Sequence, residues 1–172
     1  MGDKTENLVL GESSETLGIS GLEELRRHSC NMAASCRRYL RIYSHALNAE
    51  IYNQPCFVEA VRQLAIRHAN TRIHLLLADT GELARGGSRL VQLAQDMPSS
   101  LEIRKRAEEF SSDQRSYLLA DECGYILRKL WNDLNNVRLD YNSPYKVRNL
   151  GDDFLRAWEQ SESDPALRRL SI

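Results

Sequence analysis

The sequence predicts an α/β fold in which helices cover both faces of a mixed, mostly parallel sheet. Apolar runs typical of strands alternate with amphipathic helical segments through the first part of the chain, and such strand–helix–strand connections pair their strands in parallel. The run "TRIHLLLADTG" (71–81) is apolar almost throughout, as expected for a strand buried on both faces. Two later runs, "YLLA" and "YIL", flank a short turn and add an antiparallel hairpin.

Each element follows from the apolar repeat of its segment, every second residue in strands and every third or fourth in helices. The stretch from Ser20 to Glu23 is a capping box, which predicts that the first helix begins at Leu22. Pro55 lies in the first turn of the second helix, and Pro98 stops the third. The predicted strands are 39–45, 71–81, 101–106, 117–120, 125–127 and an edge strand, 137–141; the later predicted helices are 55–68, 87–97 and 147–160.

The composition is that of one soluble globular domain. Of 172 residues, 42% are hydrophobic and 27% are charged, and a net charge of −1 gives no general attraction to nucleic acid or anionic membranes. No apolar run is long enough to span a bilayer, so we expect no membrane partner. Residues 1–18 are polar and acidic and predict a flexible arm, and residues 19–172 predict a single domain.

The four cysteines predict reduced thiols in a cytoplasmic protein. No two of them have CxxC spacing, and no histidine lies at metal-ligand spacing from any of them. The polar N-terminal segment also lacks the apolar stretch of a secretory signal. We therefore expect a cytoplasmic location, no metal ion and no other cofactor. The cysteines are Cys30, Cys36, Cys56 and Cys123.

Three polar residues follow or end predicted strands, where open α/β sheets bind their ligands. Ser44 and His45 end the first strand, and Asp79 lies at the end of the second. Ser44 and His45 do not form a catalytic dyad, because adjacent strand residues point to opposite faces of a sheet. A turn role for Asp79, just before Gly81, competes with a role in a site.

The stretch "DQRSYLLADECGYILRKLWN" (113–132) resembles the motif HxKxxxxDx6GSxxN of the phospholipase D-like superfamily. Asp121 and Asn132 coincide with the motif Asp and Asn. The other positions differ: the motif His, Lys and Gly-Ser pair fall on Gln114, Ser116 and Arg128-Lys129. The segment "FLRAW" (154–158) is similar to the closing helix of the family. The resemblance implies a fold corresponding to one half of a phospholipase D-like protein.

The substituted positions imply that the catalysis of the family is lost. A glutamine amide neither attacks phosphorus nor transfers a proton, because its nitrogen has no available lone pair. We therefore expect no catalytic residue. The candidate ligand-binding residues combine the motif positions with the strand ends: Ser44, His45, Asp79, Gln114, Ser116, Asp121, Arg128, Lys129 and Asn132.

More narrowly, the segments "RIYSHALNAEIY" (41–52) and "FLRAWEQSESDPALRRL" (154–170) make the chain similar to an uncharacterised bacterial domain. That domain occurs alone or after a Gcn5-related acetyltransferase domain, which implies an acetyltransferase as a possible partner. Family members with one motif copy complete their site by pairing two chains. The resemblance therefore also implies a homodimer.

Three functions remain open from the sequence. The first is a non-catalytic module that binds a ligand or another protein. The second is a phosphodiesterase-type enzyme with a rebuilt site, in which Arg128 and Lys129 clamp the phosphate of an anionic ligand. The third is phosphate or nucleic-acid binding through the arginines of the first helix and strand, although no aromatic residues interleave with them.

Overall fold

A single eight-stranded sheet organises the protein, whose computed structural model describes residues 7–168. The strands lie in the order β1-β7-β6-β5-β2-β3-β4-β8. Their bounds are Leu17–Ile19 (β1), Tyr39–Ser44 (β2), Arg72–Leu77 (β3), Leu101–Lys105 (β4), Ser116–Ala120 (β5), Gly124–Arg128 (β6), Val137–Asp140 (β7) and Glu162–Ser163 (β8). The helices are Leu22–Ser35 (α1), Ala49–Tyr52 (α2), Pro55–Arg67 (α3), Gly81–Ala84 (α4), Arg89–Asp96 (α5), Pro144–Glu159 (α6) and Pro165–Arg168 (α7), with a 3₁₀ turn, Glu108–Phe110 (η1).

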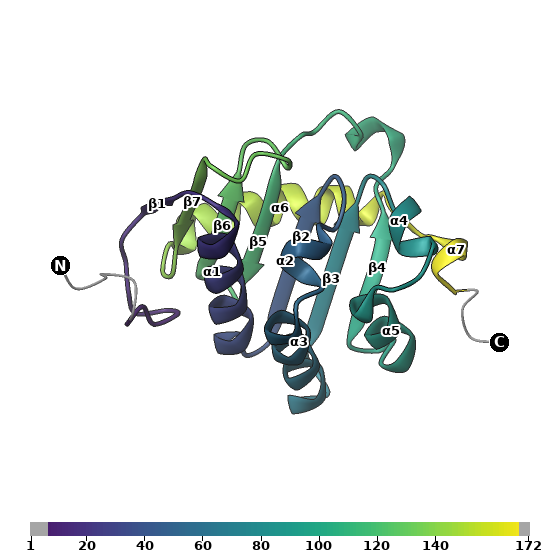
Figure 1. Cartoon of the computed structure of the whole chain (residues 1–172), viewed down its shortest axis with the longest axis horizontal. Coiled ribbons are helices and arrows are strands. Elements are labelled where there is room, and N and C mark those ends of the chain that lie inside the picture. The colour runs from purple at the N-terminus through teal and green to yellow at the C-terminus, as the bar shows by residue number, and fades with distance from the viewer. Residues whose placement is uncertain (1–6, 169–172) are drawn as a thin grey trace.

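Helices cover both faces of the sheet, as the sequence predicts. The helices α1, α2 and α3 lie on one face and α6 crosses the other (Figure 1). Two separate apolar clusters result: a large one under α1, α3 and α5, and a smaller one under α6. No helix within residues 7–168 is long and apolar enough to cross a membrane. The α/β class and the mixed sheet are therefore confirmed.

The prediction that the sheet is mostly parallel is wrong. Only the β2–β3 and β3–β4 pairs run parallel, and every other neighbouring pair in the described sheet is antiparallel. The difference arises at β2, which pairs with β3 on one side and with β5 on the other. The crossover pattern of the first half predicts the parallel pairs correctly, but it carries no information about how the later hairpin joins them.

The described part of the N-terminal segment packs on the sheet, which corrects the prediction of a loose arm for residues 7–18. Leu17–Ile19 forms β1 and pairs with β7, so β7 is not the edge strand that the sequence suggests. Gly11 also donates its N–H to the carbonyl of Tyr141. A three-residue strand is too short for an alternation pattern to reveal it. Residues 1–6 of the predicted arm lie outside the described residues.

The first helix begins at Leu22 as predicted, but its N-cap differs from the predicted one. Gly21 is the N-cap, and its φ of 97° is a conformation that favours glycine. Ser20 does not cap the helix, because its hydroxyl donates instead to the side-chain oxygen of Asn135. The predicted capping box is therefore wrong, although it marks the correct boundary.

The prediction of four reduced thiols is wrong for two of the cysteines. Cys30 on α1 and Cys56 on α3 form a disulfide, with a Cα–Cα distance of 6.0 Å. Cys36 and Cys123 are free. Burial, reinforced by the nearby Asp121 carboxylate, raises the pKa of the Cys36 thiol to about 12. Cys36 therefore remains a protonated core residue at neutral pH.

Aromatic rings dominate the contact between α6 and the sheet. Tyr43 and Tyr117, on neighbouring strands, stack with their ring centroids 4.8 Å apart. His74 stacks on Trp158 of α6 at 4.2 Å, and the Arg104 guanidinium lies over the same indole. Burial lowers the pKa of His74 to about 4, with a further lowering by nearby arginines. His74 is therefore a neutral packing residue at pH 7, as expected for a histidine inside a buried strand.

We expect His74 to make the fold sensitive to mild acid. Its folded pKa of about 4 lies below the ordinary value of 6.5, so between these values the unfolded chain binds a proton that the folded chain excludes. Stability is therefore complete above pH 6.5 and falls as the pH drops toward 4, by on the order of 1–2 kcal/mol for this half-buried group.

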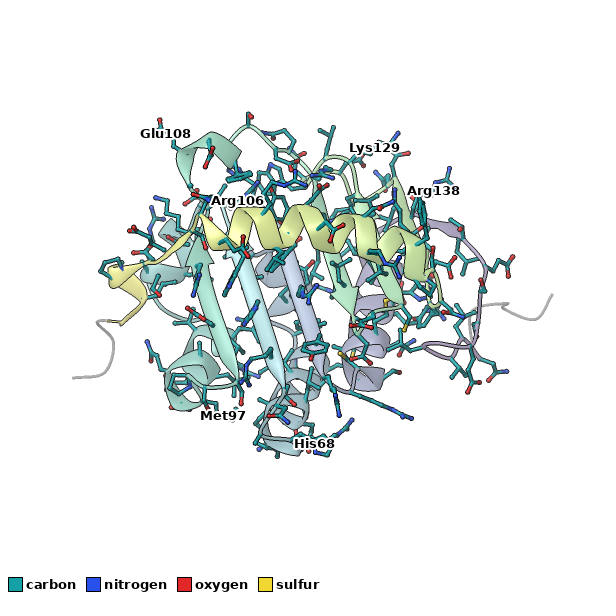
Figure 2. All side chains as sticks on the ribbon, turned by 180° about the vertical axis from the view of Figure 1, so that it is seen from behind. His68, Met97, Arg106, Glu108, Lys129 and Arg138 are labelled. Carbon is teal, nitrogen blue, oxygen red and sulfur yellow. A yellow bond between two sulfur atoms is a disulfide. The ribbon has the colours of Figure 1, made fainter. Side chains whose placement is uncertain are left out.

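Urea unfolding of the wild type, His74→Phe and His68→Gln at pH 7 and pH 4.5 measures this effect. The acid-induced loss of stability should be smaller in His74→Phe by that amount, because the variant has no group to protonate. His68 is exposed at the lower end of the molecule in Figure 2, and His68→Gln should behave as the wild type. Equal pH dependence in all three proteins would contradict the prediction.

Candidate functional site

Most of the predicted site residues meet at one edge of the sheet. The strands β2, β3 and β4 end there, β5 begins there because it runs antiparallel to β2, and β6 ends there. This strand-end edge is the upper edge in Figure 1, and in Figure 2 it carries Arg106 and Lys129. It brings together, from four strands and their following loops, Ser44, His45, Asp79, Gln114, Ser116, Arg128, Lys129 and Asn132.

Arg128 is a buried structural residue, which corrects its prediction as a phosphate clamp. Its side chain is 1% exposed. One Nη donates to Ser116 Oγ at 3.0 Å, and the other donates to the carbonyl of Trp131. The Trp131 N–H in turn donates to the main-chain oxygen of Gln114 at 2.8 Å. These bonds hold the loop after β6 against the start of β5, so the motif positions 116 and 128 satisfy each other.

The remaining motif residues of this edge face solvent. Gln114, Lys129 and Asn132 are exposed, and none of them lines the groove described below. Gln114 contributes its main-chain carbonyl to the edge rather than its amide side chain. These three side chains, predicted to bind a ligand, therefore lie outside the groove and are open to solvent.

Arg106 is the central buried polar residue of the edge, and the sequence interpretation missed it. It follows β4 and is 5% exposed. Its guanidinium lies 4.3 Å over the Tyr43 ring and donates to the Tyr43 hydroxyl, the Ser44 carbonyl and the carbonyls of Phe110 and Asp113. It thus ties the ends of β2 and β4 to the loop before β5.

A groove of about 370 Å³ opens beside this edge. The His45 ring stacks on the Trp131 indole with the ring centroids 4.8 Å apart, and both residues line the groove together with Asp79 and Glu82. Asp79 also accepts the N–H of Gly81 at 2.8 Å, which is the turn role that the sequence suggested. The complete lining is His45, Ala46, Leu47, Asn48, Ala49, Glu50, Asp79, Glu82, Leu83 and Trp131.

The groove is acidic. Glu50, Asp79 and Glu82 contribute three carboxylates, and no salt bridge within the described residues neutralises them. The nearest buried cations, Arg106 and Arg128, already donate to protein oxygens. Within residues 7–168, no cluster of three or more His, Cys, Asp or Glu is arranged to hold a metal ion. The arrangement suits hydrogen bonding and the attraction of a cation.

Four buried polar atoms at this edge have no hydrogen-bond partner in the described structure. They are Ser44 Oγ, His45 Nδ1, Asn48 Oδ1 and Arg106 Nε. Buried polar groups are almost always paired with protein, water or a ligand, so this concentration at one edge indicates room for a polar guest.

Asp121 does not belong to this edge, which corrects its place among the candidate ligand-binding residues. It lies after the far end of β5, about 17 Å from Ser116 at 3.3 Å per residue. Its carboxylate accepts the main-chain N–H groups of Arg37, Arg38 and Tyr39 at 3.0, 2.9 and 3.2 Å. Its φ of 52° makes it the only described non-glycine residue with positive φ. Asp121 is therefore a structural clamp between the hairpin and the start of β2.

Some signal for the missed residues exists in the sequence. Arg106 follows the run "LEIRK", and an arginine at a strand end is the same kind of signal that identified Ser44 and Asp79. Trp131 lies inside the segment aligned with the motif, but it falls between the motif positions. Asn48 carries no local signal, because its place in the groove depends on the short helix α2.

We expect Asp121 to matter for stability and not for ligand binding. Asp121→Ala removes three hydrogen bonds to main-chain donors and places alanine at a positive φ, so it should lower the free energy of unfolding by about 2–4 kcal/mol. Asp121→Asn keeps one acceptor oxygen and a residue that tolerates this φ, so its loss should be smaller.

Urea unfolding measures these differences, with Glu122→Ala as the matched control. Glu122 is the neighbouring exposed carboxylate and makes no such bonds, so its removal should change stability by less than about 0.5 kcal/mol. Equal losses for Asp121→Ala and Glu122→Ala would refute the structural role of Asp121.

Solved structures with a similar fold come from phospholipase D-family and DNA-binding proteins. Nuc of Salmonella typhimurium, a phospholipase D-family member, superposes with a TM-score of 0.60 at 12% identity, covering 87% of this chain and 97% of Nuc. NucT of Helicobacter pylori gives 0.61 at 10% identity, covering 87% and 100%. TrmBL2, an archaeal chromatin protein, gives 0.64 at 14% identity, and the match covers 93% of this chain and only 57% of TrmBL2.

At these identities the likeness concerns the fold alone, which is phospholipase D-like. No curated protein matches the chain in sequence. A family model does match it, over residues 21–170, which include every strand except β1 and every helix. The chain belongs to the family described as the domain of unknown function DUF7931.

Proposed function

We propose that the protein is a non-catalytic phospholipase D-like domain that binds a ligand in the groove at its strand-end edge. The observation that carries this proposal is that two buried polar atoms of residues lining the groove, His45 Nδ1 and Asn48 Oδ1, have no hydrogen-bond partner in the described structure. Leaving such atoms without partners is unfavourable by about 1–3 kcal/mol each, so a fold that gathers them at one edge gains by receiving a polar guest there.

The motif positions support the absence of catalysis. Where the family motif has a reacting histidine, this chain has an exposed glutamine, Gln114. Where the motif has a phosphate-binding lysine, Ser116 is buried and hydrogen-bonded to Arg128. The two residues therefore stabilise the edge instead of contacting a phosphodiester.

The charge of the groove favours a cationic ligand over the anionic one that the family resemblance implies. Phosphate would face the carboxylates of Glu50, Asp79 and Glu82, and like charges at close range oppose binding. An ammonium or guanidinium group would meet these carboxylates and the polar atoms His45 Nδ1 and Asn48 Oδ1.

A phosphodiesterase with a rebuilt site is the second candidate. His45 favours it, because the ring has an available nitrogen in a groove that also contains Asp79. Hydrolysis of bis(p-nitrophenyl) phosphate by the wild type and by His45→Ala separates the two candidates. A rate above that of buffer that is lost in His45→Ala would establish the enzyme; equal background rates are expected.

The fluorescence of Trp131 tests the binding proposal directly. The chain has two tryptophans, so Trp158→Phe leaves Trp131, in the groove wall, as the sole indole. We expect spermidine or arginine to quench this indole saturably, and inorganic phosphate to leave it unchanged. The effect should weaken at least tenfold in Asp79→Asn/Glu82→Gln.

The matched control for the carboxylate variants is Glu108→Gln/Glu109→Gln. These exposed carboxylates lie in η1 at the same edge but do not line the groove, so the control should bind as the parent does. Saturable quenching by phosphate would reverse the assigned charge of the ligand. No response to any of the three probes would contradict a cationic ligand.

A further inference from the structure

The disulfide between Cys30 and Cys56 encloses the segment that builds most of the groove. The two cysteines are 26 residues apart, and the loop that they close contains β2, His45, Asn48 and α2. Every groove residue from His45 to Glu50 lies within this loop. The only lining residues outside it are Asp79, Glu82, Leu83 and Trp131.

Noncovalent contacts and the disulfide together hold this wall of the groove to α1. The helix α2 is only four residues long and is not stable by itself. Arg26 of α1 donates its Nε to the carbonyl of Glu50, six residues before Cys56. Within α2, Ile51 and Tyr52 are buried in the large apolar cluster. The disulfide adds a covalent cross-link between α1 and the start of α3, directly after this segment.

The two sulfurs differ in access. Cys30 is 8% exposed, whereas Cys56 is exposed on the first turn of α3. A thiolate from solution therefore reaches Cys56 first.

We propose that Cys56 is a site of thiol–disulfide exchange with a dithiol reductant, and that opening its bond to Cys30 loosens the 45–50 wall of the groove. The exchange stands on the disulfide alone; its consequence for binding rests on the function proposed above. The groove thereby has two states, one with the Cys30–Cys56 bond intact and one with this bond reduced.

The reaction balances in two steps. A thiolate of the dithiol attacks Cys56 Sγ, a mixed disulfide forms, the bond to Cys30 breaks, and Cys30 leaves with the electron pair and takes a proton from water. The second thiol of the reductant, as its thiolate, then attacks the reductant sulfur of the mixed disulfide and releases Cys56 as a thiolate, which takes a proton from water. The reductant becomes a disulfide, and the protein gains two electrons and two protons.

Exchange with glutathione locates the attacked sulfur. The native protein is incubated with reduced glutathione at pH 8, quenched with acid and mapped by mass spectrometry. We expect the mixed disulfide on Cys56 and free Cys30, without denaturant. A mixed disulfide on Cys30, or a bond that opens only in urea, would overturn the exchange site. Cys123→Ser should react as the wild type, because Cys123 takes no part.

Hydrogen exchange of the oxidised and dithiothreitol-reduced proteins measures the effect on the groove. The amides of residues 45–54 should exchange at least tenfold faster in the reduced protein, whereas those of β3 should not change. Cys30→Ala/Cys56→Ala should exchange at the fast rate with or without reductant. Unchanged exchange at 45–54 after the bond opens would refute the coupling to the groove.

These outcomes separate this inference from the proposed function. If Trp131 responds to no probe while residues 45–54 loosen on reduction, the redox site stands and the binding function fails. If spermidine or arginine binds equally in the oxidised and reduced proteins, the binding function stands and the redox control of the groove fails.

Discussion

The antiparallel pairing of β2 with β5 is the constraint on which the rest of the structure depends. It joins a parallel unit, β2-β3-β4, to an antiparallel unit, β5-β6-β7, inside one sheet. Since β5 runs opposite to β2, its first residue lies beside the last residues of β2, and the strand ends of both units meet at one edge. Asp121 holds this junction at the other end, where its carboxylate receives the N–H groups that begin β2.

At the strand-end edge, positive charge is buried and negative charge is exposed. Its buried layer contains two arginines, Arg106 and Arg128, whose donors are directed at carbonyl and hydroxyl oxygens. Its exposed layer contains the carboxylates of the groove. Burying a guanidinium is costly unless its donors are satisfied, so the two arginines act as fixed cross-links between loops. This arrangement explains how an edge that contains two arginines presents an acidic groove to solvent.

Apolar repeats were sufficient to predict the long elements and the α/β class, because those elements bury a continuous stripe or face. They were insufficient for β1, which has three residues, and for the direction of β5, which depends on a partner more than 70 residues away in sequence.

The disulfide was missed for a related reason: Cys30 and Cys56 lie on different helices, and only the packing of α1 on α3 brings them together. The motif alignment assigned Ser116 and Arg128 contacts with a ligand, whereas in the structure they hydrogen-bond to each other at the strand-end edge. The role of Arg106 could not be predicted from the sequence, because its hydrogen bonds join the ends of β2 and β4 to the loop before β5.

Both outer strands of the sheet come from the ends of the described chain. β1 and β8 have three and two residues, and they lie at opposite edges of the sheet. A short outer strand offers few unpaired main-chain groups to another molecule, so each chain end shields the longer strand beside it, β7 or β4. Removal of either short strand would leave the main-chain groups of β7 or β4 unpaired, and such an exposed strand can pair with another copy of the chain.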